Sequence, residues 1–153
     1  MSVDRMTQAE LESYLWGAAV ELRGLIDAGD YKGYIFPLVF LKRISDVWDE
    51  EHAAALEMYE GDEELAALPE NHRFTVPDGA HWDDVRATTS NVGRKLVTAM
   101  RAIESANPDT LTGVFGDAEW TNKDLLSDAT LTGLVEHFST HTLSLANLPE
   151  DEL

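Results

Sequence analysis

A group of basic side chains interrupts an otherwise acidic sequence. The segment 86–101, RATTSNVGRKLVTAMR, contains no acidic residue and includes four bases, Arg86, Arg94, Lys95 and Arg101. The whole chain carries 11 Lys+Arg against 29 Asp+Glu, so this segment is a positive island. On a helix, Arg94 and Arg101 are seven residues apart and share a face, with Lys95 one step round. Such a row can position DNA by contacting phosphates, or it can pair with acidic neighbours within the fold, and both interpretations stay open.

A second basic pair, Lys42–Arg43, lies near the end of the most apolar stretch of the chain, residues 30–46. Apolar side chains there fall on nearly every face of a helix. This predicts a central helix that is buried on most sides, with Phe40 and Leu41 in its core. The basic pair is then either an edge of that core or a contact to DNA or to another subunit. We favour the structural role and keep both residues as weaker contact candidates.

Other residue types that carry chemistry do not form a complete site. His137 and His141 are spaced i,i+4, which can place two imidazoles on one helix face as metal ligands. The residue after His137 is Phe138 rather than the glutamate of an HExxH zinc motif, so a surface or capping role is the better interpretation. The sequence has no cysteine and no glycine-rich phosphate loop, and spacing singles out no catalytic pair among its 29 acids. We therefore predict no catalytic, cofactor-binding or metal-ligating residue in this chain.

The overall charge sets the competing classes of function. A formal net charge of −18 is unusual for a domain that binds nucleic acid over its whole surface. One interpretation is a solvated acidic surface, as in a salt-adapted protein. The alternative is a free-standing DNA mimic, an inhibitor of DNA enzymes whose carboxylates copy phosphates. The basic island argues against the mimic.

Composition also indicates the compartment. The chain is 44% hydrophobic and 26% charged, which is typical of a globular protein. No apolar run approaches the roughly 20 residues that cross a bilayer, and the acidic N-terminus does not resemble a signal peptide. We therefore expect no membrane contact and a cytoplasmic location.

Helix signals place the candidate residues on elements. Residues 7–10, TQAE, are a capping box that begins a helix, and Gly29 is expected to end it in a left-handed conformation. Asp30 can then cap the next helix. The inward stripe of the first helix is expected at positions that alternate in steps of four and three, namely Leu11, Leu15, Ala18, Leu22 and Leu25.

The second half of the chain predicts two further helices. One carries its apolar face on Val92, Leu96, Met100 and Ile103, and the last carries it on Leu131, Leu134, Val135 and Phe138. Before them, residues 73–82 place β-branched and aromatic side chains around a Pro-Asp-Gly turn. This predicts an irregular excursion with at most a small β-hairpin. The predicted fold class is all-α, an irregular helical bundle.

Ordered motifs along nearly the whole chain now suggest a family. The N-terminal ones are Leu15-Trp16, Arg23-Gly24, Asp30-Tyr31-Lys32, Phe40-Leu41-Lys42-Arg43 and Ser45-Asp46. They are followed by FTVPDGAHWDDVR, NPDTLTGVFGD and NKDLLSDATLTGLVEHFS. In this order they resemble the N-terminal helical domain of the modification subunit of type I restriction–modification systems. Each motif alone is weak, and their co-occurrence carries the resemblance.

The resemblance implies a function for a longer parent protein. Such a parent is a DNA adenine N6-methyltransferase that uses S-adenosylmethionine. It works with a specificity subunit, a second modification subunit and, for cleavage, a restriction subunit. In this family the N-terminal helical domain helps to enclose DNA and to pack the subunits.

The resemblance also implies a division of the chain. The methyltransferase motifs of full-length members, a glycine-rich cofactor loop and Asn-Pro-Pro-Phe/Tyr, do not occur in this sequence. We therefore expect residues 1–148 to be the helical domain and residues 149–153 to be an acidic linker stub toward a catalytic domain. On this interpretation the chain by itself neither binds S-adenosylmethionine nor methylates DNA.

Overall fold

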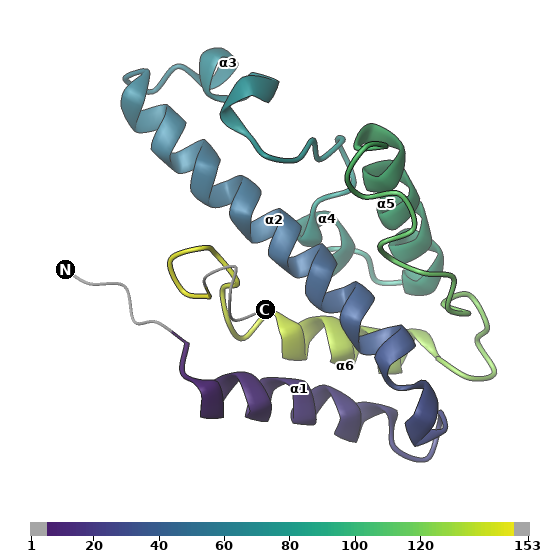
Figure 1. Cartoon of the computed structure of the whole chain (residues 1–153). Coiled ribbons are helices and arrows are strands. Elements are labelled where there is room, and N and C mark those ends of the chain that lie inside the picture. Colours follow the sequence, from purple (N-terminus) through teal and green to yellow (C-terminus); the bar gives the residue numbers. More distant parts are fainter. Residues whose placement is uncertain (1–5, 149–153) are drawn as a thin grey trace.

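The computed structural model describes residues 6–148 and is all-helical over that range (Figure 1). Its α-helices are α1 Gln8–Leu22, α2 Lys32–Met58, α3 Glu63–Ala66, α4 Trp82–Arg86, α5 Val92–Ala106 and α6 Asp128–Phe138. Two short 3₁₀ turns, Ala28–Asp30 and Pro69–Asn71, lie between them. Residues 6–148 contain no strand, so the predicted all-α class is confirmed. The predicted linker stub, 149–153, lies outside the described residues.

The long helix α2 is the axis of the bundle. Figure 1 shows α1 on one side of it, α4 and α5 on the other, and α6 crossing it, where α6 contacts α1, α4 and α5 as well as α2. The helix α1 packs mainly on α6. Leu41 of α2 is fully buried, as predicted, whereas Phe40 is only half-buried and stacks on exposed Phe36 with ring centroids 6.3 Å apart. The predicted inward faces of the two later helices are confirmed, because their eight stripe residues are all buried.

The first helix begins where predicted and ends earlier. In the capping box, Thr7 Oγ1 accepts the Glu10 N–H at 3.0 Å, and Glu10 Oε1 accepts the Thr7 N–H at 3.2 Å. The helix stops at Leu22, and Gly24, with φ +83°, makes the left-handed turn. The prediction for Gly29 was therefore wrong. Gly24 occurs first along the chain and adopts this conformation at no steric cost.

One further local prediction was wrong, whereas the irregular excursion expected at residues 73–82 forms and contains no strand. Asp30 does not cap α2, because the N-cap position is Tyr31 and makes no side-chain hydrogen bond there. In residues 73–82 the backbone N–H and C=O of Thr75 both bond to the side-chain amide of Asn107, at 2.8 Å each. One side chain thus satisfies the polar groups that a hairpin partner would otherwise take.

Candidate nucleic-acid interface

The helix α5 has one buried face and one basic face. Val92, Leu96, Met100 and Ile103 point into the core, so the bases Arg94 and Arg101 are directed away from it and are exposed. Lys95, one step round, is half-buried. The predicted arrangement of the bases on this helix therefore forms.

The start of α5 is fixed by a carboxylate from another helix. Asp128, at the start of α6, accepts the N–H groups of Asn91 and Val92 at 3.0 and 3.1 Å. These two hydrogen bonds hold the pKa of the Asp128 carboxyl below its usual range. Gly93 lies against the backbone of Trp120, where a Cβ atom would fall 1.9 Å from the carbonyl oxygen. The N-terminus of α5 is thus held by side-chain and backbone contacts from residues 120–128.

Two of the four predicted contact bases have acidic partners within the fold. Arg86 binds Glu136 with two hydrogen bonds, Nε to Oε1 at 3.0 Å and Nη2 to Oε2 at 2.9 Å. This pairing raises the pKa of Arg86 and lowers that of Glu136. Arg101 pairs with Glu104 at 2.6 Å and also donates to the carbonyl oxygen of Gly116. The charges of Arg86 and Arg101 are therefore largely compensated.

The other two bases, Arg94 and Lys95, have no ion pair or side-chain hydrogen bond among residues 6–148. They lie in the first turn of α5, where the helix dipole disfavours a positive charge. Helix stability therefore does not explain their position. An external anion would stabilise it.

A third base joins them that sequence patterns did not single out. Lys123 and Arg94 line the same shallow hollow of about 140 Å³, between the start of α5 and the loop before α6. The Lys123 ammonium donates to Asn91 Oδ1 at 2.8 Å and lies 3.9 Å from Asp128. Lys95 lies outside this hollow, with its ammonium beside Gly79. We call Arg94, Lys95 and Lys123 the α5 basic patch.

The second basic pair has the opposite environment. Lys42 and Arg43 are 5% and 8% exposed. Arg43 Nη1 donates to the carbonyl oxygens of Leu143, at 3.0 Å, and Ser144, at 3.1 Å, and also to that of Leu148. Lys42 pairs with Asp46, one turn along α2. Contact of this pair with DNA or another subunit stays a prediction.

The acidic residues that follow the pair also hydrogen-bond the backbone of segment 143–148. We call these contacts, together with those of Arg43, the clamp on this segment. Asp46 accepts the N–H of Leu143 at 2.8 Å, and Glu50 accepts those of Leu145 and Ala146 at 2.9 and 3.1 Å. Burial raises the pKa of Asp46, against the opposing effects of Lys42 and the Leu143 N–H. Burial likewise lowers the pKa of Arg43, although Glu50 acts in the other direction. Side chains of α2 thus satisfy backbone groups about 100 residues away in sequence.

The histidines at positions 137 and 141 serve helix packing. His137 Nε2 lies 2.6 Å from the carbonyl oxygen of Tyr14, and both imidazoles contact the Tyr14 ring. The Tyr14 hydroxyl donates to the carbonyl of Phe138 at 2.6 Å, and burial raises its pKa. The pair therefore joins α1 to α6 by packing, where a surface or capping role was expected.

One group in residues 6–148 has the composition of a metal site, namely Asp49, His81 and Asp83. Both ring nitrogens of His81 are already engaged. Nδ1 accepts the Asp83 N–H at 3.0 Å, and Nε2 faces Asp49 Oδ1 at 2.9 Å. Burial lowers the pKa of His81, but the hydrogen bond to Asp49 and the nearby carboxylates raise it further, so that it lies above its usual value. Capping of α4 explains this cluster, and we assign no metal to it.

The family model described as the HsdM N-terminal domain matches residues 11–138. That range runs from the first turn of α1 to the last residue of α6. The chain belongs to this family. A search of curated proteins found no match. HsdM is the modification subunit of type I restriction–modification systems, so the resemblance drawn from the sequence motifs is confirmed.

Membership of the HsdM family sets what the parent protein does in outline. It implies a methyltransferase that uses S-adenosylmethionine and associates with other subunits of a type I system. Over residues 6–148, no helix of this HsdM domain combines the length and the apolar character that a membrane span requires.

Proposed function

We propose that this HsdM N-terminal domain is a non-catalytic module that contacts the DNA backbone through the α5 basic patch. The parent on this proposal is an adenine N6-methyltransferase that acts with a specificity subunit, a second modification subunit and a restriction subunit. One observation carries the proposal. Arg94 and Lys95 have no partner among residues 6–148, although the chain carries 29 acids.

Local and total charge act on DNA binding in opposite directions. When a Lys or Arg side chain contacts a phosphate, it releases condensed counterions, and this attraction acts only at short range. The total charge of −18 repels DNA beyond the range of these contacts, out to a Debye length of about 8 Å at physiological salt. The isolated domain should therefore bind DNA feebly. The patch would act when the rest of an assembled methyltransferase holds the duplex in place.

Arg86 and Arg101 stay predicted contacts of second rank. Each would have to share its charge between a phosphate and its present partner, Glu136 or Glu104. We therefore expect the unpartnered bases to contribute more to DNA affinity.

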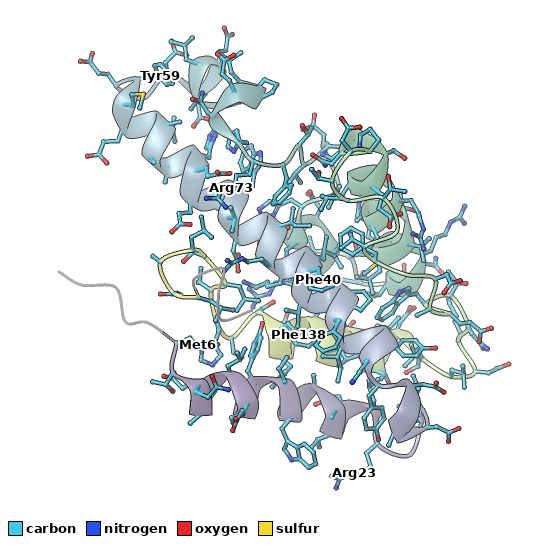
Figure 2. All side chains as sticks on the ribbon, in the orientation of Figure 1. Met6, Arg23, Phe40, Tyr59, Arg73 and Phe138 are labelled. Carbon is cyan, nitrogen blue, oxygen red and sulfur yellow. The ribbon has the colours of Figure 1, made fainter. Side chains whose placement is uncertain are left out.

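The test is an Arg94→Ala/Lys95→Ala/Lys123→Ala variant of the parent, assembled with its other subunits. Its DNA affinity should fall by a similar factor for cognate and non-cognate duplexes, because phosphate contacts carry no base information. Arg23→Ala is the matched control. Arg23 is an exposed base at the far end of α1, away from α5 (Figure 2). Equal affinities for the triple variant and the control would remove the patch from the DNA interface.

The DNA-mimic alternative predicts a different outcome from the isolated domain. A mimic would inhibit an unrelated DNA enzyme tightly and would bind no DNA itself. Inhibition of this kind that survives removal of the basic patch would favour the mimic.

A further inference from the structure

The helix α1 has a buried apolar face and a second, partly apolar face that is uncovered. Its inner face, Leu11, Tyr14, Ala18 and Leu22, is buried. The predicted stripe is therefore shifted, with Tyr14 buried where Leu15 was expected and Leu25 exposed. The outer face is formed by Ala9, Ser13, Trp16 and Val20, and all four are exposed.

The outer face has the spacing of a helix-packing seam. Ala9, Ser13, Trp16 and Val20 follow one another in steps of four, three and four, which keeps them on one side of the helix. Trp16 is 65% exposed and Val20 is 47% exposed. Tryptophan is one of the residue types enriched among the hot spots of protein interfaces. Within residues 6–148 no element covers this face.

The borders of the seam indicate the charge of what covers it. Glu12 lies along one border, and Glu10 and Glu21 lie along the other, all exposed. Glu10 also accepts the Thr7 N–H, and the Glu21 carboxylate lies beside Gly133 of α6. Among the described residues 6–27, Arg23 is the single base, at the C-terminal end of α1. Charges in these flanking positions select the partner of a packed helix. A second copy of α1 would place glutamate against glutamate, with −18 on each chain.

We infer that the outer face of α1 docks an amphipathic α-helix with Lys and Arg along its flanks, supplied by another subunit of the same assembly. This inference rests on the proposed function, since it needs the multi-subunit complex. Trp16 and Val20 supply the apolar seam, and Glu12 and Glu21 face the basic flanks of the partner.

The first test measures assembly with Trp16→Ala/Val20→Ala in the full-length modification subunit. Purified specificity and restriction subunits are each titrated onto it, and complex formation is followed by sedimentation. We expect at least a tenfold loss of affinity for the subunit that supplies the helix. Met58→Ala is the matched control, because Met58 is 72% exposed and lies at the far end of α2. A thermal melt should be unchanged for both, since neither change removes buried contacts.

A second variant tests the charge of the partner. Glu12→Lys/Glu21→Lys should weaken the same association, and more strongly at low salt than at high salt. A pair of variants that both assemble like the unaltered subunit would overturn the inference. It would equally fail if the isolated domain dimerised and Trp16→Ala abolished the dimer, because the face would then be a contact between copies.

These outcomes are separate from those for DNA. Loss of DNA affinity in the α5 patch variant, with unchanged assembly of the α1 variants, would leave the proposed function standing and remove this inference. The converse result would remove the DNA contact and keep the docking face.

Discussion

Two pairs of neighbouring bases in this chain have opposite environments. Lys42–Arg43 is buried in α2 and bonds to Asp46 and to three backbone carbonyls. Arg94–Lys95 lies at the start of α5 and has no partner among residues 6–148. The sequence around each pair shows why. Asp46 and Glu50 follow the first pair at helical spacing, whereas no acid follows the second until Glu104.

A basic pair therefore acquires its role from the residues that share its helix face. A guanidinium buried among carbonyls is a structural cross-link, because leaving those oxygens without donors is costly. A guanidinium with no internal partner, at a helix end that disfavours it, remains available to an external anion. The contrast between the two pairs can be measured on single variants.

The largest expected effect is on stability. Arg43→Ala removes the donor from the carbonyls of Leu143, Ser144 and Leu148, and should lower the free energy of unfolding by about 3 kcal/mol. Arg94→Ala, on an exposed face, should change it by less than about 0.5 kcal/mol. Urea unfolding of the two variants measures both values. Similar costs for the two substitutions would contradict the contrast.

The next effect tests how the α5 patch is positioned. In Gly93→Ala the new Cβ would lie 1.9 Å from the Trp120 carbonyl oxygen, so the loop before α6 must move. We expect a loss of about 2 kcal/mol, typical of overpacking against backbone. Gly33→Ala on α2 is the control, because its Cβ meets nothing within 4 Å and should stabilise the helix by about 0.5–1 kcal/mol. A neutral Gly93→Ala would mean that this contact does not hold the patch.

The features that depend on neighbouring residues were predicted correctly from the sequence. The Thr7–Glu10 capping box and the inward face of α5 were predictable because each depends on residues three or four apart. The end of α1 was not, because Gly24 and Gly29 compete for one role and the sequence does not rank them. The clamp of Arg43 and Glu50 on segment 143–148 joins residues about 100 positions apart, beyond the reach of any periodicity.

The α5 patch was predicted only in part for a related reason. The four bases of segment 86–101 were visible as a charge pattern, and Glu104 lies three residues after Arg101, but the partner of Arg86 was not visible. Glu136, which neutralises Arg86, comes from α6. Lys123 joins the patch because the loop before α6 packs on Gly93. In the sequence Lys123 is followed by Asp124, so its segment has no excess positive charge.

A smaller effect should appear in the pH dependence of stability. The pKa of Asp128 is lowered in the fold by the N–H groups of Asn91 and Val92. Its contribution is therefore present above its unfolded pKa of about 4 and is lost as pH falls through the lower, folded value. Asp128→Asn should reduce the loss of stability between pH 7 and pH 3, measured as urea midpoints. Asp124→Asn, at an exposed carboxylate, is the control. An identical pH profile for Asp128→Asn and the unaltered protein would mean that the carboxylate does not cap α5 in solution.

The role of Arg94 and Lys95 at DNA is tested by the salt dependence of DNA binding by the assembled methyltransferase. If each base neutralises one phosphate, Arg94→Ala/Lys95→Ala should flatten the slope of log K against log salt by about 1.8, because each neutralised phosphate contributes about 0.9. Arg23→Ala should leave the slope unchanged. If the double variant instead keeps the slope of the unaltered complex, these two bases do not meet DNA.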